Sequence, residues 1–83
     1  MPGRVQYKAS VEKDLKRLDR QAAWKVLDDI ESKLSKNPPV GTPLSGEFKG
    51  LFRLRSGDYR VIYSKTTDGV LVLRIGHRKE AYR

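Results

Sequence analysis

The sequence predicts an α+β fold in which two N-terminal helices pack on one face of a small, mainly antiparallel sheet of about four strands, in the order β-α-α-β-β-β. Two observations carry this prediction. Residues 10–35 repeat apolar side chains at intervals of three and four, as amphipathic helices do, and residues 51–75 alternate apolar and polar side chains around Gly-Asp and Asp-Gly pairs. Because 83 residues leave no room for a second core, we expect one domain over residues 1–83.

The first strand and the first helix are expected to be short. Residues 4–8 alternate polar and apolar side chains, which predicts a half-buried strand. Ser10 is a favourable N-cap, and the apolar positions that follow it at helical spacing are Val11, Leu15 and Leu18. We therefore expect a helix that begins after Ser10 and turns one apolar face toward the sheet.

A second helix restarts near Asp19 and is the most regular element of the sequence. Its expected buried stripe consists of Ala23, Val26, Leu27, Ile30 and Leu34, and the charged residues outside that stripe include Asp28, Asp29, Glu31 and Lys33. Trp24 lies beside the stripe, so we expect it to pack at the margin of the core. Pro38 and Pro39 end the helix, because proline cannot continue one.

Residues 38–47 are rich in proline and glycine, which predicts a loop from the helices to the sheet. Three strands are expected after it, at about 51–55, 59–65 and 70–75. Gly57 and Asp58 suit a two-residue hairpin turn. The pairs that this turn implies are Ser56 with Tyr59, Arg55 with Arg60, Leu54 with Val61, and Phe52 with Tyr63.

This register divides the hairpin into an apolar face and a basic face. Because side chains alternate across a strand, the face toward the helices would hold Phe52, Leu54, Val61 and Tyr63, and the other face would hold Arg53, Arg55 and Arg60. Facing like charges destabilise a sheet, so a bound anion would remove a structural cost. A three-residue turn at 67–69 would add Arg74 to this face. The alternative interpretation is a set of solvated surface arginines.

The net charge of +8 is concentrated in the C-terminal half. Residues 1–47 hold nine Lys or Arg and seven Asp or Glu, a net +2, whereas residues 48–83 hold nine and three, a net +6. Arginine guanidinium groups bind phosphate through paired hydrogen bonds, and tyrosine and histidine rings stack on bases. The C-terminal half is therefore typical of a surface that binds a polyanion. The alternative is a basic surface that only keeps a small protein in solution.

The composition argues against several kinds of site. With no cysteine and a single histidine, His77, the chain lacks disulfides and the ligand set of a zinc site, and we expect no cofactor. No apolar run approaches the ~20 residues that span a membrane, and no signal-peptide pattern opens the chain. We therefore expect a cytoplasmic protein with no membrane partner.

RNA is a substrate that a site built of arginines could cleave. The ribose 2′-OH is an internal nucleophile, so the protein must align it, neutralise charge on the phosphoryl oxygens and assist departure of the 5′-oxygen. The basic half has no Ser-His-Asp set, Gly-rich phosphate loop or paired carboxylates, which leaves cations with Tyr82 or His77. With such weak proton-transfer groups, we expect slow turnover on free RNA.

Two segments resemble the RelE/ParE toxin superfamily. They are Arg-Leu-Arg-Ser-Gly-Asp-Tyr-Arg-Val-Ile-Tyr at residues 53–63 and Arg-Ile-Gly-His-Arg-Lys-Glu-Ala-Tyr at residues 74–82. Together with the expected order of elements, the resemblance covers nearly the whole chain, and the nearest branch resembles RelE. It implies a toxin of a type II toxin–antitoxin pair, an endoribonuclease that cuts mRNA in the ribosomal A site and depends on the ribosome for activity.

The resemblance implies a separate role for each of four catalytic residues. Arg60 corresponds to the family arginine that holds the scissile phosphate. Arg78 corresponds to the C-terminal arginine that stabilises charge or protonates the leaving group. Tyr82 corresponds to the tyrosine that orients the nucleotide and helps to activate the 2′-OH. Arg53 stands where well-studied members carry a lysine.

One departure from the family pattern concerns the general base. A second family lysine is replaced by Leu51, so a candidate base is missing, and either Lys49 or His77 takes its place or activity is lower. The residues expected to bind RNA around the catalytic group are Lys49, Arg55, Arg74, His77, Lys79 and Arg83.

The resemblance also implies partners and leaves two other functions open. The partners are a cognate antitoxin that lays a helix along the toxin, the ribosome with its mRNA, and operator DNA for the toxin–antitoxin complex. A ParE-like toxin would poison DNA gyrase by binding, without nuclease chemistry. A nucleic-acid-binding module would have no catalysis at all. A shared fold does not decide among them, because function depends on the site.

Overall fold

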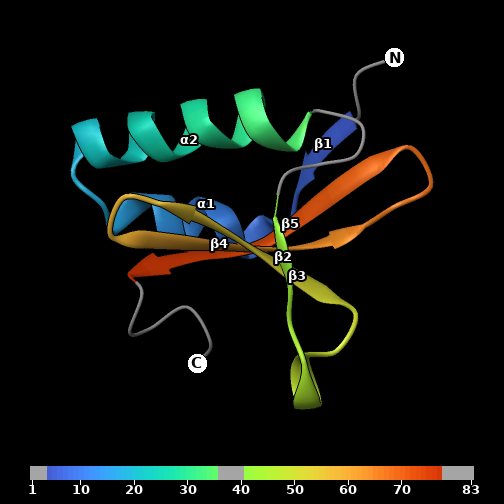
Figure 1. The fold of residues 1–83 in the computed structure, drawn as a ribbon. Coiled ribbons are helices and arrows are strands. Elements are labelled where there is room, and N and C mark those ends of the chain that lie inside the picture. The colour runs from blue at the N-terminus through green and yellow to red at the C-terminus, as the bar shows by residue number, and fades with distance from the viewer. Residues whose placement is uncertain (1–3, 36–40, 78–83) are drawn as a thin grey trace.

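The computed structural model describes residues 4–35 and 41–77 of the chain (Figure 1). Its elements are β1 (Arg4–Tyr7), α1 (Ala9–Lys16), α2 (Arg20–Leu34), β2 (Thr42–Pro43), a 3₁₀ turn (Gly46–Phe48), β3 (Leu51–Ser56), β4 (Tyr59–Lys65) and β5 (Gly69–His77). The strands form one sheet in the order β1-β5-β4-β3-β2, with β1 parallel to β5 and the other neighbours antiparallel. The predicted α+β class is confirmed, with one strand more than expected.

The additional strand is β2, which lies in the segment predicted to be a loop. Thr42 pairs with Arg53 and Pro43 with Phe52, at the outer edge of the sheet. An edge is where a proline is tolerated in a sheet, because it has no N–H to donate to a second neighbour. Gly41 precedes this strand and lies against Tyr63, whose hydroxyl oxygen would be only 2.0 Å from a Cβ built on Gly41. Two residues are too few to show the alternation by which a strand is recognised in a sequence.

Both helices lie on the same side of the sheet, where they close a single buried cluster (Figure 1). The helices contribute Val11, Val26, Ile30 and Leu34, and the sheet contributes Leu54, Val61, Tyr63, Val70, Val72 and Ile75. The expected stripe of α2 is thus confirmed at its three buried positions. Neither of the described helices has the length and apolar character needed to cross a membrane.

The two helices begin in different ways. The carboxylate of Asp19 accepts a hydrogen bond of 2.8 Å from the backbone N–H of Ala22, which is a regular side-chain N-cap for α2. The predicted cap of α1 is wrong, because Lys8 occupies the N-cap position and makes no side-chain cap. Ser10 lies inside the first turn and donates to the backbone carbonyl of Leu73 on β5, at 3.1 Å. The Ser10 hydroxyl, predicted to cap the helix, therefore bonds to the backbone of β5 instead.

Two side chains of α2 differ from their predicted environments. Trp24 is 69% exposed and does not pack at the margin of the core. Asp29, predicted to lie outside the stripe, is 9% exposed and accepts a hydrogen bond of 2.6 Å from the Ser56 hydroxyl at the end of β3. The apolar pattern of the helix does not reveal this carboxylate's partner, because Ser56 lies 27 residues away in the sequence.

The predicted hairpin register is confirmed in all four of its pairs. Gly57 has a φ of 60°, and it is the first of the two turn residues, the position at which a type II′ hairpin turn requires a positive φ. The next turn is one residue shorter than predicted, because the N–H of Thr66 bonds to the carbonyl of Gly69 at 2.9 Å. A bulge between the pairs Ile62–Arg74 and Tyr63–Val72 restores the expected position of Arg74 opposite Ile62. The bulge also lets Val72 and Ile75, three residues apart, both reach the core.

Candidate nucleic-acid interface

Four arginines lie on the side of the sheet away from the core. Residues directly opposite each other on neighbouring strands point to the same face of the sheet. The strand pairing therefore defines rows of side chains across the sheet, and two of these rows contain the arginines. Across β3, β4 and β5 the rows are Arg53–Ile62–Arg74 and Arg55–Arg60–Gly76. We call Arg53, Arg55, Arg60 and Arg74 the arginine face. The predicted grouping of three of them is confirmed, and the bulge adds the fourth.

The arginine face concentrates positive charge over a small area. Arg55 and Arg60 are a directly opposed pair, and the Cβ atoms of such a pair lie about 5 Å apart. No ion pair within residues 4–35 and 41–77 joins Arg53 or Arg55 to a carboxylate. At the centre of the face Ile62 is only 4% exposed, and Gly76 places no side chain beside Arg60. Among the described residues, β5 thus places Arg74 beside Ile62 and no side chain beside Arg60, whose own Nε is buried.

Arg74 differs from the other members because it is anchored to α1. Its Nε donates to the carboxylate of Asp14 at 3.1 Å, and the same carboxylate oxygen accepts the backbone N–H of Ile75 at 2.9 Å. The Asp14 side chain is 7% exposed and that of Arg74 is 39% exposed. A buried carboxylate that accepts two hydrogen bonds is held firmly in place. Asp14 therefore fixes the Nε end of the Arg74 side chain, while part of that side chain stays exposed to solvent.

The remaining predicted site residues do not all lie on this face. Lys49 is exposed and precedes β3, outside the paired rows. His77 pairs with Tyr59, and their rings make a T-shaped contact with centroids 6.0 Å apart. Because neighbours along β5 alternate, His77 belongs to the face opposite that of Gly76. The predicted residues Arg78, Lys79, Tyr82 and Arg83 lie outside the described residues.

Two buried carboxylates near the site were not predicted from the sequence. Asp14 follows Val11 by three positions, and Asp29 follows Val26 by three, so both fall within an apolar stripe. A charged residue at such a position is a signal of a buried partner, because an unpaired buried charge is very unfavourable. The hydrogen bond from Ser56 is the main cause that lowers the pKa of Asp29, with Lys25 at 3.3 Å adding to it against the opposing effect of burial.

Comparisons with known proteins agree with this architecture. Residues 5–82 match the family described as the ParE toxin of the type II toxin–antitoxin system parDE. Toxin RelE of Mycobacterium tuberculosis is 35% identical over an alignment of 86 positions, and the alignment covers 99% of this chain and 88% of the relative. Both the family and the relative therefore extend over almost the entire chain.

Solved structures of similar fold include toxin–antitoxin complexes. A chain of the RelBE2 complex from Mycobacterium tuberculosis is 30% identical with a TM-score of 0.84, and the match covers 96% of this chain and 95% of that one. A chain of the archaeal RelE–RelB complex from Pyrococcus horikoshii is 29% identical with a TM-score of 0.65, over 98% and 100% of the two chains. With a family match that spans nearly all of its length, this chain belongs to the RelE/ParE superfamily of type II toxin–antitoxin toxins.

Proposed function

We propose that this toxin is an endoribonuclease of the RelE kind that cuts mRNA in the ribosomal A site. The observation that carries the proposal is the arginine face, where opposed cations accumulate at a structural cost. The relative that is 35% identical is named Toxin RelE, which favours RNA as the target. The chain offers cations in abundance and few groups that transfer protons, so the ribosome would complete the alignment of the reacting atoms.

The proposed reaction is an internal transfer within the RNA. The 2′-oxygen attacks the adjacent phosphorus, the bond from phosphorus to the 5′-oxygen breaks, and the products are a 2′,3′-cyclic phosphate and a 5′-hydroxyl. One proton leaves the 2′-OH and one reaches the departing 5′-oxygen. Arg60, between Arg55 and Gly76, would hold the phosphoryl oxygens, with Arg53 in the neighbouring row of the face. Arg78 and Tyr82 would take the roles that the family resemblance implies.

The group that deprotonates the 2′-OH is where this chain departs from the family pattern. Leu51 stands where the family carries a lysine. His77 contacts Tyr59 on the other face of the sheet, which argues against it as the group that deprotonates the 2′-OH. Lys49 precedes β3 and is the lysine nearest in sequence to Leu51.

A ribosome assay tests the proposal directly. Purified toxin is added to programmed ribosomes with a defined codon in the A site, and the mRNA ends are mapped. We expect cleavage within that codon, a loss of about 10²–10³-fold in rate for Arg60→Ala, and a comparable loss for Tyr82→Ala. Arg20→Ala, at the exposed start of α2, is the matched control and should cleave normally. Intact mRNA under conditions in which the toxin is folded would refute the nuclease proposal.

The family match also favours a second candidate function. The family that matches residues 5–82 is described as the ParE toxin. A ParE-like activity, in which the toxin poisons DNA gyrase by binding, is therefore tested with a supercoiling assay. Inhibited supercoiling together with intact mRNA would establish that function. If neither activity is found, a nucleic-acid-binding module without catalysis is the remaining interpretation.

We also propose a cognate antitoxin as the protein partner. Two of the similar solved structures are complexes of a toxin with an antitoxin, from Mycobacterium tuberculosis and from Pyrococcus horikoshii. Coexpression with the product of a neighbouring reading frame, followed by copurification, tests this partner. The resulting complex can then be assayed for binding to the DNA upstream of the two genes.

A further inference from the structure

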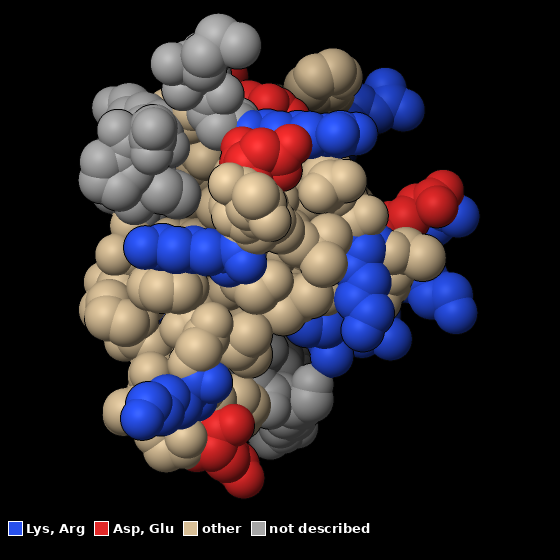
Figure 2. All heavy atoms as spheres, turned by 90° about the vertical axis from the view of Figure 1, so that its right-hand side faces the viewer, with Lys and Arg blue, Asp and Glu red and all other residues tan. Residues whose placement is uncertain are grey.

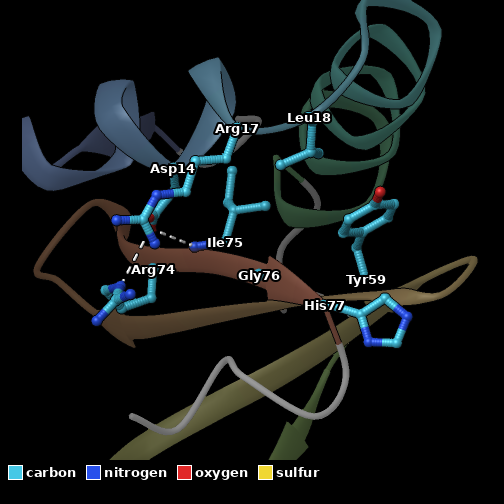
Figure 3. A pocket seen from close by; sticks show the side chains of 8 residues that line it. All are labelled: Asp14, Arg17, Leu18, Tyr59, Arg74, Ile75, Gly76 and His77. Atoms are coloured by element: carbon cyan, nitrogen blue, oxygen red, sulfur yellow. Dashed lines mark hydrogen bonds and ion pairs between the residues drawn. The ribbon is translucent and has the colours of Figure 1, made fainter.

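A pocket lies beside the arginine face, at the edge of β5 that no strand covers. The strand β1 pairs with β5 only as far as Tyr7 and Val72, so from Leu73 onward the neighbour of β5 on that side is α1. The pocket has a volume of about 390 Å³, within the range of small-ligand sites. Its lining consists of Asp14, Arg17, Leu18, Tyr59, Arg74, Ile75, Gly76 and His77 (Figure 3).

The side chains around this pocket offer the contacts that a nucleotide needs. The Tyr59 and His77 rings meet edge to face at one end, and Leu18 and Ile75 add apolar surface. Arg17 lies at the end of α1, is exposed, and forms no ion pair with any other residue in the described ranges. Aromatic rings stack on bases and guanidinium groups bind phosphate, so this lining suits a base with its attached phosphate.

The backbone of β5 adds polar groups at the same place. The N–H of Ile75 points to the uncovered edge, where it meets Asp14. Two residues on, the backbone of His77 faces the same edge, because alternate residues of an antiparallel strand direct their polar groups to the same side. Because the Ile75 N–H is already bonded to Asp14, the main chain of His77 is the part of this edge that can pair with a base and favour some bases over others.

The pocket and the arginine face are continuous. Arg74 belongs to both, and Gly76 lines the pocket while it pairs across the strands with Arg60. Neighbouring strands are about 4.8 Å apart, so Arg60 and the pocket edge are separated by little more than one strand. Among the described residues, Gly76 leaves the surface between Arg60 and the pocket without a side chain.

We propose that this pocket binds one nucleotide of the RNA substrate, next to the phosphate held on the arginine face. Its base lies against Tyr59 and His77, and its phosphate contacts Arg17. The identity of the ligand as RNA rests on the proposed nuclease function, whereas the pocket's capacity for a nucleotide can be measured without the ribosome. The pocket would thereby contribute to the choice of cleavage site.

Nucleotide titration of the isotope-labelled, full-length toxin provides the first test. The four ribonucleoside 5′-monophosphates are added separately, with inorganic phosphate as the probe for a plain anion site. We expect the nucleotides to shift the NMR signals of His77 and Leu18, and the four bases to differ in affinity. If phosphate alone gives the same shifts, or if no ligand moves these signals, the proposed nucleotide pocket is wrong.

A pair of charge reversals on α1 provides the second test. Arg17→Glu is compared with Lys16→Glu, a neighbouring exposed residue that does not line the pocket, so both variants change the net charge equally. The ligand is a short single-stranded RNA with 2′-O-methyl groups, which cannot undergo internal attack. We expect Arg17→Glu to weaken binding about tenfold more than Lys16→Glu, because only Arg17 contacts the phosphate of the bound nucleotide. Equal weakening by the two variants would overturn the proposal.

The two tests also separate this proposal from the nuclease proposal. If nucleotides bind in the pocket but A-site mRNA stays intact, the pocket is supported and the nuclease function fails. If mRNA is cut, the nucleotides do not bind and Arg17→Glu leaves the pattern of cleaved codons unchanged, the nuclease function stands and the pocket fails.

Discussion

Arg55 and Arg60 form a like-charged pair that is expected to lower the stability of the fold. The two residues face each other across the hairpin, and like charges so placed repel. A hairpin selected for stability alone would place an opposite charge or a β-branched residue at one of these positions. A phosphate bound between them would relieve the repulsion, so the pair that weakens the free toxin would strengthen the proposed complex with RNA.

A double-mutant cycle should measure this repulsion. Arg55→Gln is expected to raise the free energy of unfolding by about 0.2–1 kcal/mol, and Arg60→Gln should then add less than it would alone. Urea denaturation at low salt gives the four stabilities. At about 1 M salt, where the Debye length falls to about 3 Å, the coupling should shrink. An attractive coupling, or one unaffected by salt, would contradict the geometry described for this pair.

Asp29 and Ser56 predict how stability depends on pH. The Ser56 hydroxyl is the main cause that lowers the pKa of Asp29 below its ordinary value of 3.8. A carboxyl group whose pKa is lower in the folded state stabilises the fold above 3.8, and the contribution disappears as pH falls through the folded-state value. Ser56→Ala should therefore destabilise the protein at neutral pH by more than it does in strong acid.

The matched control for this prediction is Ser45→Ala, since Ser45 is exposed and makes no side-chain cap of the 3₁₀ turn. Urea midpoints of the three proteins are compared at neutral pH and below pH 3.8. If Ser56→Ala lowers the urea midpoint equally at both pH values, the hydroxyl acts on packing alone and not on the ionisation of Asp29.

At the scale of elements, α1 takes the place of a missing strand beside β5. Ser10 donates to the carbonyl of Leu73, and Asp14 accepts from the N–H of Ile75. The two spacings match, because four residues of a helix advance about 6 Å and two residues of a strand about 6.6 Å. Side chains of the helix thus satisfy backbone groups that would otherwise form an open sheet edge, where another chain could pair.

Removing the carboxylate of this contact should have a large effect. Asp14→Ala removes the acceptor of the Ile75 N–H and one acceptor of the Arg74 side chain, and we expect a loss of about 1–3 kcal/mol in the free energy of unfolding. Ser10→Ala should cost about 0.5–1.5 kcal/mol. Hydrogen exchange at the Ile75 amide should accelerate in the first variant. Glu12→Ala, on the exposed side of α1, should change neither measurement appreciably.

The elements also show what a sequence pattern can and cannot predict. The hairpin register was predictable because a two-residue Gly-Asp turn fixes every pair that follows. The two-residue β2 and the bulge in β5 were not, since both depend on fitting strands and core together. Arginines of the candidate site were found by register, whereas Asp14 and its contact with Arg74, 60 residues apart, required the folded chain.

For the molecule as a whole, charge is distributed unevenly over the surface. The flank shown in Figure 2 carries Lys and Arg side chains from top to bottom, with Asp and Glu side chains beside several of them. The helices contain acidic as well as basic residues, and the net +8 arises mainly from residues 48–83. The positive charge of residues 48–83 would attract a polyanion, and in the proposed function the arginine face would be the place of closest contact.

Salt dependence should distinguish phosphate contacts made by the arginine face from the general effect of the net positive charge. For single-stranded RNA the logarithm of the association constant falls with the logarithm of salt concentration by about 0.7 per phosphate contact. If the four residues of the arginine face each contact a phosphate, the slope is about −3. The double variant Arg55→Gln/Arg60→Gln should reduce its size by about 1.4. Lys13→Gln/Arg20→Gln, on exposed positions of the helical side, makes the same change in net charge and should leave the slope nearly intact. Fluorescence anisotropy with a 2′-O-methyl RNA measures both slopes, and equal reductions in the two double variants would mean that RNA responds to net charge and not to the arginine face.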